Sequence, residues 1–166
     1  MGKFLLSVHV VAAILFIGPV TVAVSLFPRY ARTALTGAGD GDADAGRAAA
    51  VAALLHRISR VYALLGLSVP VAGVGVAIEL GVLGDAWLVV SIVLTAAAAA
   101  LLALVVLPAQ RAAMSALGTS ASETDSTRAA SLADFGRLAT GAGVFGLLWV
   151  VVVVLMVVRP GSTTGV

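Results

Sequence analysis

The sequence predicts an all-α membrane protein, a bundle of four transmembrane helices that run up-down-up-down. Hydrophobic residues make up 61% of the 166 residues and charged residues only 11%, whereas about a quarter of a soluble domain is charged. The apolar residues gather in four long blocks that are almost free of charge, as a lipid bilayer requires. A water-soluble globular domain is therefore excluded, and we expect residues 1–166 to form one membrane domain with the lipid bilayer as its surroundings.

The four blocks have the length of membrane-spanning helices. The first covers residues 4–27 and carries no formal charge. The second covers 61–83 and contains one carboxylate, Glu79, and the third and fourth cover 86–107 and 138–158. At 1.5 Å per residue each helix reaches roughly 31–36 Å, which is enough to cross a hydrocarbon core of about 30 Å. Four spans follow.

Positive charges predict the side of the membrane on which each loop lies. Eight arginines lie within residues 28–60 and 108–137, whereas Lys3 and Arg159 carry the positive charges of the other side. Because loops rich in Lys and Arg stay in the cytoplasm, we expect both long loops there and both termini outside the plasma membrane. The stretches directly before the second and fourth blocks are expected to be helical, so these helices should have cytoplasmic extensions.

Small residues spaced four apart predict close contacts between helices. They are Gly73, Ala77, Gly81, Ala139, Ala142, Gly143 and Gly146. The strip in the second block and the strip in the fourth are expected to face each other, or to serve a homo-oligomer or a larger membrane-protein partner. Either arrangement gives these residues a role in helix packing.

One motif and the charge distribution point away from nucleotides and nucleic acids. The letters of residues 141–146 match the dinucleotide pattern G-x-G-x-x-G. That pattern binds pyrophosphate only between a strand and a helix, and here it lies inside a membrane helix. No basic patch is dense enough for nucleic acid. We therefore expect neither a nucleotide nor a nucleic-acid partner.

Pro19 and Pro70 lie inside the first and second blocks. Each removes a backbone donor, so the carbonyls of Leu15 and Gly66 lose their usual partners. Counted from the outer ends, the prolines lie about 22 Å and 20 Å deep. We expect two helix kinks at one level, which are either ordinary kinks of membrane helices or the walls of a pocket.

The ionisable residues inside the blocks are His9 and Glu79. Such residues are costly in a membrane and are candidates for function, each needing a partner. Their depths from the outer ends of their blocks are about 7.5 Å and 6 Å. We therefore expect them to face each other and to hold a metal ion or a proton, with Asp85 and Met156 completing a ligand set. Two simpler interpretations stay open: Glu79 reaches the membrane surface, and His9 hydrogen-bonds across helices.

The remaining histidine, His56, precedes the second block on the cytoplasmic side. We expect it to form a basic collar with Arg57 and Arg60 against anionic lipid headgroups. Because His9 and His56 lie at opposite membrane faces, one haem cannot be held by both. The chain has no cysteine, which excludes disulfides, thiolate metal sites and covalently attached haem.

Residues 6–18 read LSVHVVAAILFIG. This segment resembles the opening helix of bacterial copper-resistance-D-type membrane domains. It is equally similar to a family of uncharacterised bacterial small integral-membrane proteins with the pattern His-Val-x-Ala-x-x-x-(Trp/Phe)-x-Gly. The resemblance implies that His9 is the functional position and that copper or haem b is its ligand. The chain departs from the pattern in having Phe16 where Trp is usual and no histidine inside the second to fourth blocks.

Three classes of function follow. The first is a small non-enzymatic integral membrane protein that handles a metal ion or a proton at an outer-side site of His9 and Glu79. The second is an accessory or structural subunit of a larger membrane complex. The third is a b-type haem redox membrane protein that takes a second axial ligand from another chain. The sequence contains no G-x-S-x-G, H-E-x-x-H or P-loop motif, so an enzyme of those classes is not expected.

Overall fold

The computed structural model describes residues 2–37, 42–118 and 125–161, with side chains for 2–37, 43–118 and 135–161. Within these ranges every regular element is helical. The elements are α1 (Gly2–Thr36), α2 (Asp42–Gly66), α3 (Ser68–Leu80), α4 (Ala86–Leu101), the π-helix η1 (Leu102–Val106), α5 (Leu107–Gly118) and α6 (Asp125–Val158). The predicted all-α class is confirmed.

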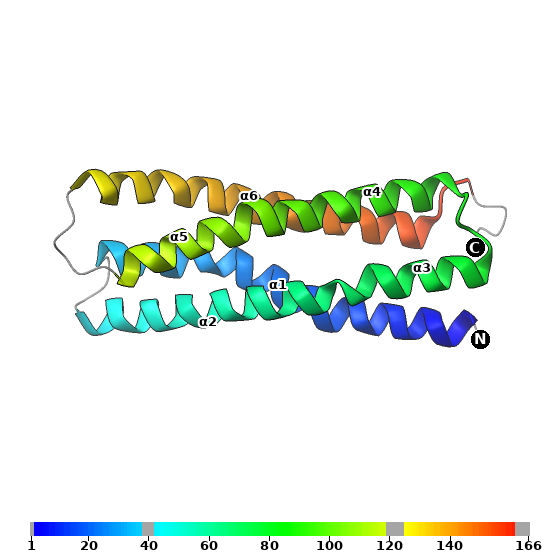
Figure 1. Ribbon diagram of the computed structural model, residues 1–166, viewed down its shortest axis with the longest axis horizontal. Coiled ribbons are helices and arrows are strands. Elements are labelled where there is room, and N and C mark those ends of the chain that lie inside the picture. The colour runs from blue at the N-terminus through cyan, green and yellow to red at the C-terminus, as the bar shows by residue number, and fades with distance from the viewer. Residues whose placement is uncertain (1, 38–41, 119–124, 162–166) are drawn as a thin grey trace.

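Four helical stretches are long and apolar enough to cross a membrane, as predicted. They are Gly2–Thr36, Ala43–Leu80, Ala86–Gly118 and Phe135–Val158. Figure 1 shows them side by side in a long bundle in which consecutive stretches run in opposite directions, so that α6 ends where α1 begins. The most extensive contacts join α1 to α2 and α4 to α6.

The outer surface of the bundle is apolar. Large apolar side chains are between 72% and 74% exposed at Leu64, Val71, Leu104 and Val157. In each of the four stretches, only 22% of an apolar 18-residue segment is buried inside the protein. Soluble proteins rarely leave a continuous apolar surface open to water. Lipid tails cover such a surface without cost, so the fold is that of a multi-pass membrane protein.

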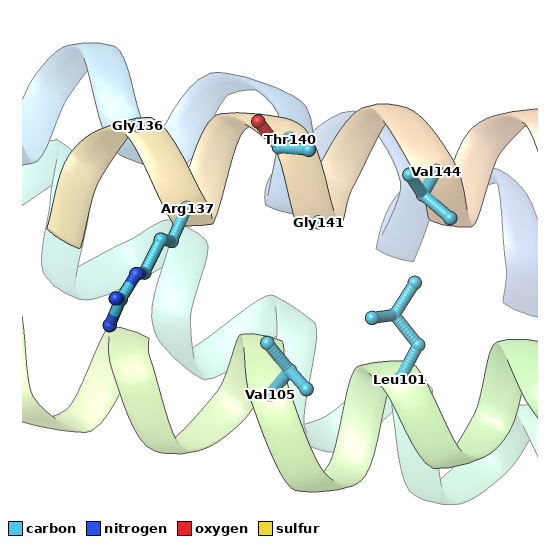
Figure 2. Close-up of a pocket in the computed structure, with 7 residues that line it drawn as sticks. All are labelled: Leu101, Val105, Gly136, Arg137, Thr140, Gly141 and Val144. Carbon is cyan, nitrogen blue, oxygen red and sulfur yellow. The ribbon is translucent and has the colours of Figure 1, made fainter.

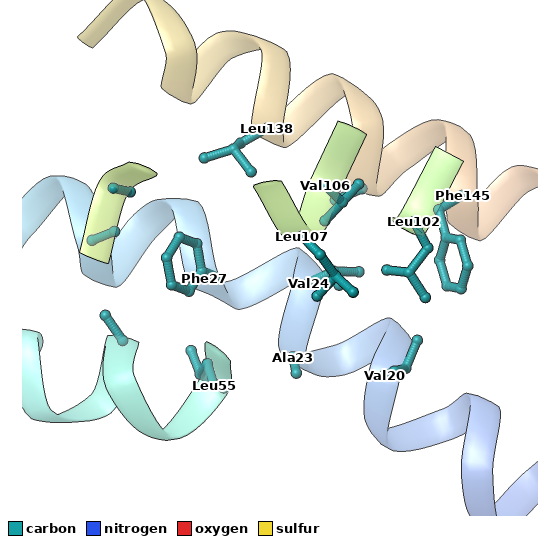
Figure 3. Close-up of a cluster of buried hydrophobic side chains, with 14 of the residues drawn as sticks. Val20, Ala23, Val24, Phe27, Leu55, Leu102, Val106, Leu107, Leu138 and Phe145 are labelled. Atoms are coloured by element: carbon teal, nitrogen blue, oxygen red, sulfur yellow. The ribbon is translucent and has the colours of Figure 1, made fainter. Parts of the chain in front are cut away.

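The core lies where all four stretches meet, near the middle of the bundle (Figure 3). Val24, Phe27, Val106 and Phe145 are at most 1% exposed there. The core continues toward the end of the bundle where α1 and α5 terminate. It passes through the buried small residues Ala31, Ala52 and Ala113. Because alanine lets helices approach closely, α1 and α5 stay packed against the core as far as Leu35 and Leu117, beyond the apolar blocks that the sequence indicates.

Two helices are interrupted next to prolines. α2 ends at Gly66 and α3 begins at Ser68, and at the break the Leu67 N–H bonds to the Leu64 carbonyl at 3.2 Å. Pro70 has no N–H to offer, which explains why the regular ladder fails just before it. The π-helix η1 likewise ends two residues before Pro108, which also lacks a backbone N–H. α1, in contrast, remains helical through Pro19.

A cavity of about 40 Å³ lies beside both predicted kink positions. It is bordered by Ile17 and Val20, which flank Pro19, and by Gly66 and Pro70. On the α6 side it meets Trp149, whose indole Nε1 is buried without a hydrogen-bond partner among the described residues. The two prolines therefore lie at a similar level, and the space between them is small.

Candidate functional site

His9 is buried between α1 and α3, with 8% of its surface exposed. Its Nδ1 lies 3.0 Å from the carbonyl oxygen of Val69. A carbonyl oxygen only accepts hydrogen bonds, so Nδ1 carries the proton and donates it. The other ring nitrogen, Nε2, is therefore the atom that has a lone pair to offer a proton or a metal ion.

Gly73 provides the space for the His9 ring. A β-carbon at position 73 would lie only 2.9 Å from His9 Cε1, which is closer than two carbon atoms approach in a packed interior. Any larger residue would require the His9 ring or the helix backbone to shift. The predicted role of Gly73 in close packing thus involves a histidine on α1 and not the small residues of α6.

Glu79 does not lie beside His9. Its side chain is exposed, and a β-carbon at Gly2 would lie 3.6 Å from Glu79 Cγ. Glu79 therefore lies beside the first turn of α1. His9 lies seven residues beyond Gly2, about 10 Å along the axis of α1. The expected match in depth fails because α1 begins at Gly2 and α3 ends at Leu80, so the true helix ends differ from the ends of the apolar blocks.

The described contacts of Asp85 and Met156 involve Trp87 and its neighbours. Asp85 Oδ2 accepts a hydrogen bond from Trp87 Nε1 at 2.9 Å, and the Arg159 guanidinium carbon lies 5.5 Å from the centre of the Trp87 ring. Met156 packs against a small cluster that contains Trp87. These contacts close one end of the bundle between α4 and α6.

The copper site implied by the resemblance does not fit the residues present. A copper ion takes several nitrogen, sulfur or oxygen ligands. Across residues 2–37, 43–118 and 135–161, whose side chains are described, no group of three or more His, Asp or Glu side chains is placed to hold a metal ion. His9 offers one nitrogen, and neither Glu79 nor Asp85 is turned to it. For haem b, this chain supplies a single axial imidazole at this end of the bundle.

Gly81 ends α3 instead of packing against another helix. Its φ angle is +68°, in the left-handed region, and its N–H bonds to the Ile78 carbonyl at 3.1 Å. Glycine adopts this conformation without a steric penalty and is the common residue there. Ala77, one turn earlier, is 2% exposed and packs in the small cluster with Trp87.

The small residues of α6 point in two directions. The buried face of α6 carries Leu138, Ala142 and Phe145. Ala139 and Gly143 are exposed, Gly146 is partly buried, and a β-carbon at Gly143 would meet nothing within 4 Å. The two predicted strips therefore do not face each other within the chain.

A second buried polar group, centred on Gln110, was not expected. His56 Nδ1 lies 3.0 Å from Gln110 Oε1, and Gln110 Nε2 lies 3.3 Å from Ser59 Oγ. Ser59 in turn donates to the Leu55 carbonyl at 2.9 Å. Gln110 and Ser59 have no exposed surface. Three side chains from α2 and α5 thus form one hydrogen-bonded chain.

The donor and acceptor roles in this hydrogen-bond network fix the tautomer of His56. Ser59 gives its hydrogen to a carbonyl, so it accepts from the Gln110 amide nitrogen. The amide oxygen then faces His56, and Nδ1 must donate to it. The ring also packs on Phe27, with centroids 6.3 Å apart. His56 is therefore a half-buried partner of α1 and α5, which corrects the expectation of a lipid-facing collar with Arg57 and Arg60.

Sequence reasoning had weak signals for this network. Gln110 is the single glutamine in the chain and follows Pro108 at the end of the third block. His56 and Ser59 are three residues apart and so share a helix face. Neither signal tells which way α5 is rotated, and that rotation brings Gln110 inward.

Comparisons with known proteins give no relative to guide the assignment. No protein family, no curated protein and no solved structure matches this chain. The function must therefore be argued from the side chains themselves.

Proposed function

We propose that this chain is a small, non-enzymatic integral membrane protein that binds and releases a proton at His9, in the outer half of the bundle. The hydrogen bond from His9 Nδ1 to the Val69 carbonyl supports this proposal, because it holds the ring in place and leaves Nε2 as the proton acceptor. A proton needs one lone pair, whereas a metal ion needs several ligands, and His9 offers one nitrogen.

The position of Val69 couples protonation of His9 to the angle between α2 and α3. Val69 lies between the break at Leu67 and Pro70, where α2 and α3 join. A buried imidazolium is costly in an apolar environment. Protonation of Nε2 therefore favours an arrangement in which the ring moves toward polar surroundings, and the α2–α3 junction is the segment that changes angle in response.

A spin-label experiment tests this function. The chain has no cysteine, so cysteines at Leu54 on α2 and Ile78 on α3, both exposed, give one labelled pair across the junction. In nanodiscs we expect the distance distribution between the labels to differ at pH 8 and pH 5. His9→Gln keeps a hydrogen-bond donor without a titrating ring, and it should abolish the difference.

His56→Gln is the matched control, because it removes the other histidine, and it should preserve the difference. Identical distributions at the two pH values would refute the proposal. A shift that persists in His9→Gln would assign the proton to another group.

A second function is favoured by one observation on α6. Ala139 and Gly143 are exposed, with open space beyond Gly143, so this strip is free to accept a helix from a larger membrane complex or from a second copy. A Gly143→Cys variant, oxidised in the membrane, reports a second copy at this strip as a disulfide-linked dimer. An exposed Val151→Cys variant is the control that should stay monomeric.

A further inference from the structure

Two hollows lie along α6. The larger is a groove of about 510 Å³ between α6 and the facing segment of α4 and η1, with the apolar side chains Leu101, Val105 and Val144 along its walls (Figure 2). The smaller is the cavity of about 40 Å³ at the break between α2 and α3. Among the residues with described side chains, the buried nitrogen or oxygen atom that lacks a hydrogen-bond partner is Nε1 of Trp149, which borders this cavity. The cavity is therefore the hollow where a polar ligand is needed.

Most of the cavity wall is apolar. Apart from Tyr62, Thr95 and Trp149, the side chains that line it are hydrocarbon. Figure 3 shows two of them, Leu102 and Phe145, side by side in the core. A buried polar group without a partner is costly, and buried tryptophan N–H groups usually have an acceptor. The acceptor for the Trp149 N–H must therefore come from inside the cavity.

Thr95 brings a second polar group to the cavity. Thr21 and Thr36 each donate their hydroxyl hydrogen to the carbonyl four residues earlier, at 2.9 Å. Among the described residues, Thr95 makes no hydrogen bond of this kind with its side chain. Its hydroxyl is thus a donor at the cavity, as the Trp149 indole is.

Pro70 provides the matching acceptor. Pro70 and Gly66 both border the cavity. Because Pro70 has no N–H, the Gly66 carbonyl loses its usual helical donor. In membrane helices, ordered water is one of the groups that supply the missing bond. Two donors and one acceptor thus border the same small space.

We propose that the cavity binds a water molecule, which accepts hydrogen bonds from Trp149 Nε1 and Thr95 Oγ1 and donates one to the Gly66 carbonyl. A buried water typically makes about three hydrogen bonds, and it needs roughly 10–15 Å³ of such space. A cavity of about 40 Å³ has room for it. The water joins α4 and α6 to the break between α2 and α3. Its binding does not depend on the proton site at His9.

NMR of the indole N–H groups in nanodiscs tests the site. Trp149→Phe assigns the signals, because Trp87 is the other tryptophan in the chain. In a rotating-frame experiment, contact with a bound water proton and hydrogen exchange with solvent give signals of opposite sign. We expect the contact signal at Trp149 Nε1–H. Its absence would overturn the proposal, as would a contact signal from lipid acyl protons in its place.

Filling the cavity should remove the water. Ala99 borders the cavity, whereas Ala97 on the same helix is exposed. Ala99→Val should therefore abolish the contact signal, and the matched control Ala97→Val should keep it. A signal that persists in Ala99→Val would place the water outside the cavity and overturn the proposal.

Thr95→Val tests a hydrogen-bond partner without filling the cavity, because valine keeps the shape of the side chain and removes the hydroxyl. Thr21→Val is the matched control, since the Thr21 hydroxyl is already bonded to the Ile17 carbonyl. We expect a weaker contact signal in Thr95→Val than in Thr21→Val, because the water loses a partner. Equal signals would remove Thr95 from the site and overturn the proposed geometry.

Discussion

The ring of His9 rests directly on Gly73, where a β-carbon would approach His9 Cε1 to 2.9 Å. This contact lets a histidine on α1 reach the Val69 carbonyl on α3. It joins the candidate proton site to the junction between α2 and α3, and it makes one glycine responsible for the geometry of that site.

We expect Gly73→Ala to destabilise the bundle and to displace His9. Overpacking a well-filled interior typically costs about 1–3 kcal/mol. The matched control is Gly75→Ala, two residues away, where a β-carbon meets nothing within 4 Å. Thermal unfolding in detergent measures the difference, and ¹⁵N NMR of the imidazole reports whether Nδ1 still donates. Equal melting of the two variants would show that the ring yields freely.

The chain of hydrogen bonds around Gln110 predicts strong coupling between two residues. Gln110→Leu leaves the buried Nδ1–H of His56 without an acceptor, which should cost about 1–3 kcal/mol. His56→Phe keeps an aromatic ring against Phe27 and removes the donor. We expect the double variant to lose clearly less stability than the sum of the single variants, as measured by unfolding in detergent. Additive losses would mean that the two side chains do not interact.

Substitution by leucine should affect the stability of the bundle differently at two glycines that lie two residues apart on α6. Gly141→Leu drives a side chain into Val106, whose Cγ2 would lie 3.3 Å from the first added carbon, and should cost about 1–3 kcal/mol. Gly143→Leu adds a side chain to open space and should leave the melting temperature of the monomer nearly unchanged. Similar destabilisation by both would place Gly143 in an interface that a single chain does not form.

The arginine distribution predicts the orientation of the bundle in the membrane. Ala50 lies in the first half of α2, toward the end of the bundle where α1 terminates. Gly84 lies in the turn between α3 and α4, at the opposite end. In intact cells a cysteine at Gly84 should react with an impermeant thiol reagent. A cysteine at Ala50 should react only after the membrane is permeabilised. The reverse labelling pattern would place both termini inside and His9 in the inner half.

How much of the site followed from sequence is clear from His9, Glu79 and Gln110. The cost of ionisable groups in a membrane marked His9 as a residue that needs a partner, and a hydrogen bond across helices was one of the open interpretations. Its partner is a backbone carbonyl, which no side-chain pattern identifies. The sequence does not identify Gln110 as a buried residue, because an uncharged amide just after an apolar block is typical of the protein surface.

The sequence by itself determined the class of protein. Hydropathy acts segment by segment, so the four apolar blocks specify four helices long and apolar enough to cross a membrane, whatever their neighbours are. The tertiary structure decided the helix ends, the rotation of each helix about its axis and the partner of each polar side chain. Position in the sequence gives depth along an axis, while only packing between helices fixes rotation. That is why Glu79 lies beside Gly2, Gly143 faces outward and Gln110 faces in.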